Sequence, residues 1–215
     1  MLDTRIYGEI LENTIYIVDD HKMLQNGLRF WFEQNSSWKI TGAFESVKPC
    51  LEALAKTSTE ALPEIIIVDI QLADESGFSL VQEITRNYKQ IKCVMYSMYD
   101  TAGYILQAKN SGAKGYISKV ASEKELLKCL DIVKNGGTYL ESRFESIMEN
   151  LEPITSVLSK QESIVFEKML QGKSNEEISN ELFISLHSVH NYVTYIYTLS
   201  DVHNRTEFLE KFGKK

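Results

Sequence analysis

Strand-like and helix-like segments alternate five times between residues 14 and 137, and this alternation constrains the fold more than any other feature. Each short apolar run, typical of a buried strand, is followed by a segment with apolar residues at helical spacing. The strand-like runs cover 14–20, 38–44, 64–69, 91–97 and 114–118. The helix-like segments cover 23–35, 49–57, 78–88, 101–112 and 122–137. This order predicts a doubly wound, five-stranded parallel sheet with helices on both faces.

Polar side chains follow the strands at the edge where doubly wound sheets bind their ligands. An acidic pair, Asp19 and Asp20, ends the first strand, and Asp69 ends the third. Ser97 ends the fourth strand, and Lys119 follows the fifth. Because an uncompensated buried carboxylate is costly, three acids at one edge indicate a bound cation, and hard carboxylate oxygens suit Mg²⁺.

The same five residues indicate phosphoryl chemistry. Asp69 stands alone at the end of a central strand and is the candidate nucleophile. Ser97 would donate a hydrogen bond to one phosphoryl oxygen, and Lys119 would pair with another. A haloacid-dehalogenase-type phosphatase also uses an aspartyl nucleophile, but it needs a second acid two residues later, where this chain has Gln71.

The last third of the chain is predicted to be helical. Residues 137–156 are interpreted as a linker with room for one short helix. A helix-turn-helix fits the segment that follows, with a first helix over 175–182 and a recognition helix over about 186–198. Capping boxes are expected for the pairs Ser122 and Glu125, Ser159 and Glu162, and Ser174 and Glu177.

These motifs together resemble a two-component response regulator of the NarL/FixJ/LuxR type. The resemblance lies in "IVDD", "IIIVDIQ", "VMYS" and "YISK" in the first part, and in "LSKQESIVFEKMLQGKSNEEISNELFIS" and "HNRTEF" in the second. It implies a receiver domain with a flavodoxin-like sheet over 13–136, a linker over 137–156, and a LuxR-type helix-turn-helix domain over 157–215.

The resemblance also implies roles for single residues. Asp69 would accept a phosphoryl group from a histidine kinase, and Ser97 and Tyr116 would form the switch pair. Catalysis would be limited to self-phosphorylation and slow self-dephosphorylation, so no further enzymatic activity is expected. The Mg²⁺ ion would be held by Asp19, Asp20, Asp69 and the backbone carbonyl of Gln71.

The proposed partner of the second domain is duplex promoter DNA, bound in the major groove by a homodimer. Residues at the start of the recognition helix should face outward, while Val189, Val193 and Ile196 recur at helical spacing and should pack inward. The candidate DNA contacts are His187, Ser188, His190, Asn191, Tyr192 and Arg205.

The charge of this domain is unusual for a DNA-binding protein. No Lys or Arg lies between Leu182 and Asn204, and residues 152–215 carry 7 Lys and Arg against 9 Asp and Glu. Phosphate neutralisation normally supplies much of the affinity for DNA. An alternative therefore stays open, in which the protein is a phosphorylation-switched adaptor whose helical domain binds protein.

Composition places the chain among cytoplasmic proteins. No apolar run is long enough to span a membrane, and "MLDTRIYGEILENT" does not resemble a secretion signal. The three cysteines are far apart and odd in number, which fits neither a metal site nor a disulfide framework, and they are expected in the core.

Overall fold

The computed structural model describes residues 13–73 and 75–212, and every structural statement below concerns this part of the chain. By its internal contacts the chain divides between Val94 and Met95 into two compact units, each described by itself. The N-terminal stretch that we expected not to be a secretion signal lies almost wholly outside the described residues. None of the described helices has both the length and the apolar character needed to cross a bilayer.

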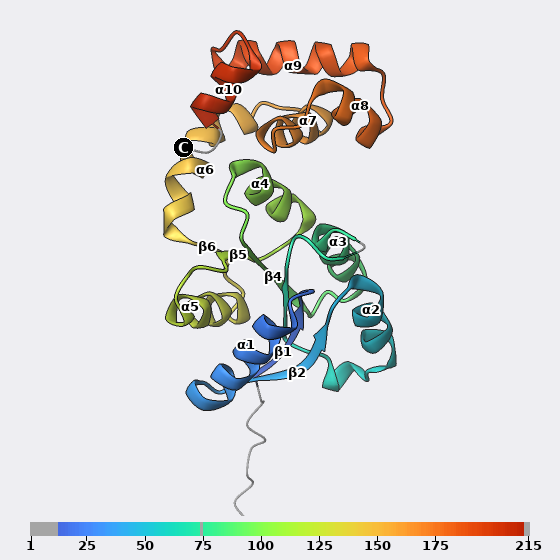
Figure 1. Ribbon diagram of the computed structural model, residues 1–215, viewed down its shortest axis with the longest axis vertical. Helices are drawn as coiled ribbons and strands as arrows, with labels where there is room; N and C mark the ends of the chain where they lie inside the picture. Colours follow the sequence, from blue (N-terminus) through green and yellow to red (C-terminus); the bar gives the residue numbers. More distant parts are fainter. Residues whose placement is uncertain (1–12, 74, 213–215) are drawn as a thin grey trace, which may run out of the picture. The chain divides into compact units, whose positions relative to one another are not determined.

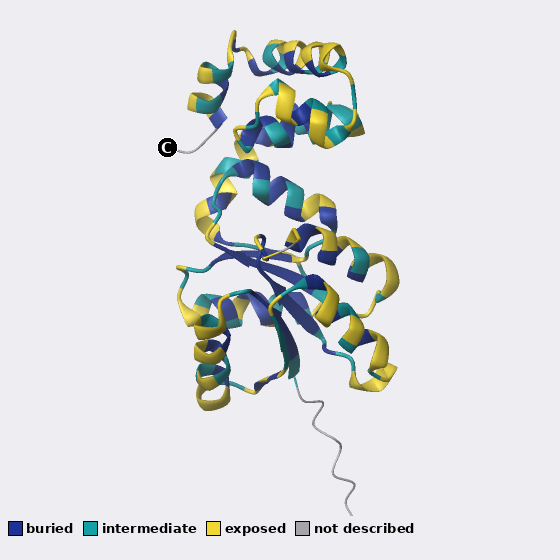
Figure 2. Ribbon diagram, turned by 45° about the vertical axis from the view of Figure 1, so that its right-hand side comes forward, coloured by how far each residue is buried: buried dark blue, intermediate teal, exposed yellow. Residues whose placement is uncertain are grey.

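The first unit is built on parallel pairing of β1 with both β2 and β3 (Figure 1). Strand β3 is buried on both faces, as its continuous apolar sequence predicts for an interior strand. Figure 2 shows the middle of the sheet in dark blue. The elements of this unit are β1 (Asn13–Val18), α1 (Lys22–Asn35), β2 (Trp38–Phe44), α2 (Val47–Lys56), the 3₁₀ helix η1 (Thr59–Ala61), β3 (Ile65–Val68) and α3 (Gly77–Asn87).

Strand β4 (Lys92–Ser97) follows, and the strand order of the whole sheet is β2-β1-β3-β4-β5-β6. The first five positions match the order of doubly wound, flavodoxin-like sheets, so the predicted fold class is confirmed. The sequence did not indicate the sixth strand. The remaining elements of the sheet region are α4 (Ala102–Ser111), β5 (Gly115–Ser118), α5 (Glu123–Lys134) and β6 (Tyr139–Leu140).

The predicted linker is more ordered than expected, because helix α6 (Ser142–Thr155) occupies most of it. Its apolar residues recur at helical spacing, and Pro153 lies in its last turn. A proline in a last turn removes one donor but leaves the preceding turns intact. The apolar stripe of α6 consists of Phe144, Ile147, Met148, Leu151 and Ile154.

Four further helices complete the second unit: α7 (Lys160–Leu170), α8 (Asn175–Leu182), α9 (Leu186–Ser200) and α10 (Arg205–Phe212), drawn in orange and red in Figure 1. Val189, Val193 and Ile196 are all buried, which confirms the inward face predicted for α9. Phe166 and Phe208 stack edge to face in the same core, with ring centroids 5.5 Å apart.

The predicted capping boxes form at Ser159 and at Ser174. The third is only half formed: the Ser122 hydroxyl accepts from the Glu125 N–H, but the Glu125 carboxylate accepts the Tyr139 hydroxyl at 2.5 Å instead. A tertiary partner thus takes the side chain that the local motif would have used.

The three cysteines are free and buried, as expected from their spacing. Burial raises the pKa of the Cys50 thiol to about 12, so this group stays protonated and packs as a small apolar side chain.

Within the second unit, α4 packs against α7. Gly103 allows this approach, since a Cβ there would lie 2.7 Å from the Glu167 carbonyl oxygen. Two side-chain hydrogen bonds cross the contact: Asn110 donates to the Glu167 carboxylate, and Gln171 donates to Gln107 at 2.7 Å. Glu167 is only 6% exposed, so a carboxyl group is buried between the two helices.

Candidate functional site

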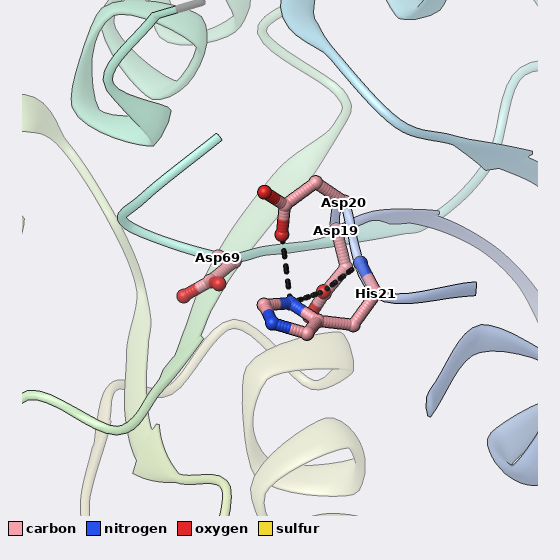
Figure 3. A group of neighbouring side chains, drawn as sticks. All are labelled: Asp19, Asp20, His21 and Asp69. Atoms are coloured by element: carbon pink, nitrogen blue, oxygen red, sulfur yellow. Dashed lines mark hydrogen bonds and ion pairs between the residues drawn. The ribbon is translucent and has the colours of Figure 1, made fainter. Parts of the chain in front are cut away.

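Three carboxylates that follow β1 and β3 meet in the first unit (Figure 3). Asp19, Asp20, Asp69 and the intervening His21 each offer one ligand atom, and these atoms all lie within 4.8 Å of one another. Asp19 and Asp69 are buried, whereas Asp20 is partly exposed. The structure therefore brings together the three acids that the strand-end argument selected.

Backbone hydrogen bonds hold these acids at the edge of the sheet. The Asp69 N–H donates to the Val18 carbonyl at 2.9 Å, and the Asp19 N–H donates to the Phe44 carbonyl at 3.0 Å. Both bonds continue the parallel ladder one residue past the strands. The acids consequently occupy the carboxyl-terminal edge, where ligands bind in open α/β sheets.

Helix α3 begins immediately beside Asp69. The Gly77 N–H donates to the Ile70 carbonyl at 2.8 Å, and a Cβ at Gly77 would lie 1.8 Å from the Asp69 carbonyl oxygen. Only a residue without a side chain allows the helix to start this close to the strand end. Gly77 therefore contributes to the site by allowing α3 to begin next to Asp69.

Sequence reasoning missed Gln25, which supports the acidic pair from α1. Its Nε2 donates to the Asp19 carbonyl at 2.5 Å and to the Phe44 carbonyl at 2.9 Å, and the residue is 8% exposed. A signal was present, because Gln25 lies at helical spacing with the buried Leu28 and Phe32. A polar residue on an apolar helix face needs a buried partner.

Sequence reasoning also missed His21. Its Nδ1 lies 2.7 Å from Asp20 Oδ1 and 3.0 Å from Asp19 Oδ1, and its backbone N–H donates to Asp19 Oδ1 at 2.9 Å (Figure 3). The imidazole thus lies against both carboxylates. The sequence places His21 next to the "DD" pair, but it does not show that the imidazole ring points toward these carboxylates.

The donor set fits a divalent cation. Three carboxylates supply hard oxygen ligands of the kind Mg²⁺ prefers. Asp20 Oδ1 is buried, and within the described part of the chain it has no hydrogen-bond partner of good geometry, although His21 Nδ1 lies 2.7 Å away. A cation at this position would satisfy that oxygen and reduce repulsion among the acids.

Gln71, the expected backbone ligand, lies two residues past Asp69 and forms an isolated antiparallel bridge with Ser76. Nothing in that bridge tests the expected contact of its carbonyl with a metal, so this role stays a prediction.

The other predicted groups lie in the second unit. Ser97 is buried at the end of β4, and its carbonyl accepts the Lys119 N–H at 3.0 Å. The structure therefore ties these two residues together through the backbone. Tyr116 is buried on β5 and donates its hydroxyl to the Tyr99 carbonyl at 2.6 Å. Convergence of Ser97 and Lys119 on a phosphoryl group at Asp69 stays a prediction.

All candidate DNA contacts except Arg205 lie in the first half of α9. His187, His190 and Asn191 are exposed, whereas Ser188 and Tyr192 are partly buried. The Ser185 hydroxyl caps the helix by accepting from the Ser188 N–H at 3.0 Å, which leaves the exposed side chains projecting from its first turns.

Arg205 differs from the other candidates because it is half-buried. Its Nη2 donates to Asn175 Oδ1 at 2.8 Å, joining α10 to α8, and burial lowers the pKa of the guanidinium. Nη1 is buried with no hydrogen-bond partner among the described residues. The position suits a structural role at least as well as contact with DNA phosphate.

Several lysines of the helical domain are also engaged internally. Lys168 and Lys173 both pair with Glu181, at 2.7 and 2.8 Å, and Lys211 donates to the Ser200 carbonyl at 2.7 Å. Lys160 is exposed, and the C-terminal lysines lie outside the described residues. The shortage of positive charge noted in the sequence is thus accentuated by the fold.

Comparison with known proteins agrees with this organisation. The family model of the response regulator receiver domain matches residues 15–131, and that of the bacterial regulatory proteins of the luxR family matches residues 156–211.

Two curated relatives match most of the chain. The chain is 27% identical to the oxygen regulatory protein NreC of Staphylococcus haemolyticus, over 94% of this chain and 97% of the relative. It is 28% identical to the transcriptional regulatory protein MctR of Rhizobium johnstonii, over 80% of this chain and 79% of the relative.

A structure of RcsB from Salmonella enterica serovar Typhimurium, bound to promoter P1flhDC in the presence of phosphomimetic BeF₃⁻, superposes with a TM-score of 0.62. It is 21% identical and covers 94% of this chain and 98% of its own, which supports the fold. The chain belongs to the response regulators of transcription, with a receiver domain followed by a LuxR-type helix-turn-helix DNA-binding domain.

Proposed function

We propose that Asp69 is the phospho-acceptor of this response regulator and that its phosphorylation controls promoter binding by the C-terminal domain. The observation that carries the proposal is the grouping of Asp19, Asp20 and Asp69 at the ends of two adjacent parallel strands. No metabolic substrate is required, since a receiver needs only a phosphodonor.

A backbone hydrogen bond orients the Asp69 carboxylate for this role. The Ile70 N–H donates to Asp69 Oδ1 at 2.7 Å, which fixes the rotation of the carboxylate. Asp69 Oδ2 then attacks the phosphorus of a phosphohistidine, the P–N bond breaks, and its electron pair leaves with the imidazole of the histidine kinase. Mg²⁺, held by Asp19, Asp20, Asp69 and the Gln71 carbonyl, would neutralise phosphoryl oxygens.

The phosphoryl group supplies the signal. Ser97 would donate its hydroxyl to one phosphoryl oxygen and Lys119 would pair with a second, while Tyr116 would report the change as the aromatic member of the switch pair. The similarity to MctR, named as a transcriptional regulatory protein, supports a transcriptional output. The protein would act in the cytoplasm, as a homodimer on promoter DNA.

The test is phosphorylation with acetyl phosphate and Mg²⁺, followed by intact-mass measurement and a gel shift on the upstream region of the gene. We expect the mass of one phosphoryl group to be added and promoter binding to strengthen. Asp69→Asn should abolish both responses. Glu75→Gln, at an exposed carboxyl in the same loop, should retain them. Equal mass gain in parent and Asp69→Asn would reject the assignment.

A second candidate function is a phosphorylation-switched adaptor, in which the helical domain binds protein. The engaged lysines and the exposed side chains of Phe183 and Tyr195, 95% and 42% accessible, favour it. Loss of all DNA retention at low salt would support the adaptor over the transcriptional output.

A further inference from the structure

The junction between β5 and the linker helix contains a buried carboxylate to which the proposed function assigns no role. Strand β6 pairs with β5 for only two residues, Gly115 with Tyr139 and Tyr116 with Leu140. The Glu141 N–H adds one more bond, to the Tyr116 carbonyl at 3.2 Å. The chain then turns away into α6.

The Glu141 side chain continues the ladder where the backbone leaves it. Its Oε2 accepts the Ser118 N–H at 2.8 Å, and both residues are buried, at 8% and 2% exposure. Its Oε1 lies 2.7 Å from Arg143 Nε. A carboxylate that accepts a backbone N–H and pairs with an arginine is compensated for its burial, and such charge-assisted bonds are strong.

A second contact joins the same two elements. The Phe144 ring packs edge to face on Tyr116, with centroids 5.7 Å apart and an interplanar angle of 82°. The Arg143 guanidinium lies 4.4 Å from the centroid of the Phe144 ring. The start of α6 therefore contacts both Tyr116 and Ser118, the residue directly before Lys119.

We propose that Glu141 is a positioning residue that couples the end of β5 to the linker helix α6. The inference rests on the proposed function, in which Lys119 binds the phosphoryl group. Ser118 directly precedes Lys119, so a movement of Lys119 toward that group also displaces the Ser118 N–H. Because Glu141 binds this N–H and stands at the start of α6, the helix that leads to the DNA-binding domain moves with it.

The test uses the full-length protein, ¹⁵N-labelled, with Mg²⁺ and beryllium fluoride as the phosphoryl mimic. Glu141→Ser removes the carboxylate but keeps a good residue for a helix start. Glu141→Gln retains an oxygen that can accept the Ser118 N–H. Glu145→Ser alters an exposed carboxyl in the first turns of the same helix and is the matched control.

In the parent we expect the mimic to shift the amide resonances of Ser118 to Ala121 and those of Ser142 to Ile147. In Glu141→Ser the first group should still shift while the α6 group loses its response. Glu141→Gln should restore the α6 response, and Glu145→Ser should match the parent. If Glu141→Ser loses its fold, its spectrum collapses and Glu141→Gln carries the test. In Glu141→Gln we then expect the Ser118 amide proton to lie upfield of its position in the parent, because a neutral amide oxygen accepts a weaker hydrogen bond than a carboxylate. The α6 response should be retained.

Two results would overturn the coupling: an unchanged α6 response in Glu141→Ser, or a parent in which the Lys119 region responds but α6 does not. A parent in which no resonance near Asp69 responds to the mimic would instead reject the proposed function. The two failures are therefore distinguishable.

Discussion

At the residue scale, the acidic site depends on uncharged residues as much as on charged ones. Gly77 lets α3 begin against the Asp69 carbonyl, and Gln25 binds the Asp19 carbonyl from α1. Neither residue is itself a ligand. Both fix the backbone that carries the ligands.

Gly77→Ala should therefore destabilise the protein and move Asp69. The added Cβ would meet backbone, which cannot rotate away, so we expect a loss of about 1–3 kcal/mol in the free energy of unfolding, typical of overpacking. Urea denaturation measures this loss. Gly27→Ala is the control, because a Cβ at Gly27 meets nothing within 4 Å. Equal stability of the two variants would contradict the packing argument.

His21 should influence which cation the site binds. Its Nδ1 touches both members of the acidic pair, and an imidazole nitrogen favours Zn²⁺ over Mg²⁺ relative to carboxylates alone. We expect His21→Asn to lower the ratio of Zn²⁺ to Mg²⁺ affinity by about tenfold or more, since losing even a group bonded to a ligand costs about 10–100-fold.

Calorimetric titration of each metal into parent and variant measures this ratio. An identical ratio in both proteins would show that the imidazole moves aside when a cation binds. Asp69→Asn provides a reference in which a carboxylate, rather than the imidazole, is removed.

At the element scale, we expect the contact of α4 with α7 to depend on pH through Glu167. Burial raises the pKa of this carboxyl to about 7, against the opposing effects of the Asn110 hydrogen bond and of Lys168. Lys109 of α4 and Glu152 of α6 line the same cavity of about 290 Å³. The packed state therefore holds a proton that an exposed glutamate would release at lower pH.

The direction in which stability changes with pH follows from the linkage between proton binding and folding. Since the folded state binds the proton more tightly than the unfolded state, stability falls as pH rises from about 4.5 to about 7 and is constant above that range. Glu167→Gln should abolish this contribution, leaving the variant more stable than the parent at pH 8 by on the order of 1–3 kcal/mol and comparable at pH 5.

Urea denaturation of both proteins at several pH values measures the difference, and other titrating groups cancel in the comparison. A difference that does not grow between pH 5 and pH 7 would contradict the burial of a protonated Glu167. Glutamine keeps an oxygen that can accept the hydrogen bond from Asn110, so Glu167→Gln removes the titrating group and leaves this contact in place.

The elements themselves were largely predictable, because strand and helix periods are local properties. Every predicted strand and helix of the first 137 residues is present, and the inward face of α9 is as expected. Helix α6 is longer than the one short helix expected in the linker, because its apolar stripe finds a core to pack into. Strand β6 is two residues long and exists only because β5 offers an edge.

At the scale of the whole molecule, the balance of charge should limit the electrostatic share of DNA binding. The slope of log affinity against log salt is about −0.9 per phosphate neutralised. With Lys168 and Lys173 paired to Glu181, we expect a shallow slope of about −2 to −4 for a dimer on its operator, rather than the value of about −10 known for strongly electrostatic repressors.

Glu181→Gln should release both lysines, strengthen DNA binding and steepen that slope by about 1–2 per protomer. Glu210→Gln, at an exposed acid on α10 that forms no ion pair with a lysine among the described residues, changes net charge equally. Binding isotherms at several salt concentrations compare the two. A steep slope in the parent, or equal slopes in both variants, would show that the internal ion pairs do not withhold these charges.

The sequence by itself determined the parallel sheet, the order of its elements and the acids at its edge. Parallel strands all end at one edge, so the residues after them are neighbours whatever the details of packing. Tertiary structure alone decided the contacts of Gln25, Gly77, Glu141 and Glu167. Their partners depend on how the elements are oriented and how closely they approach, as in the hydrogen bond from Asn110 to Glu167 across 57 residues. The spacing of apolar residues along the chain does not predict such contacts.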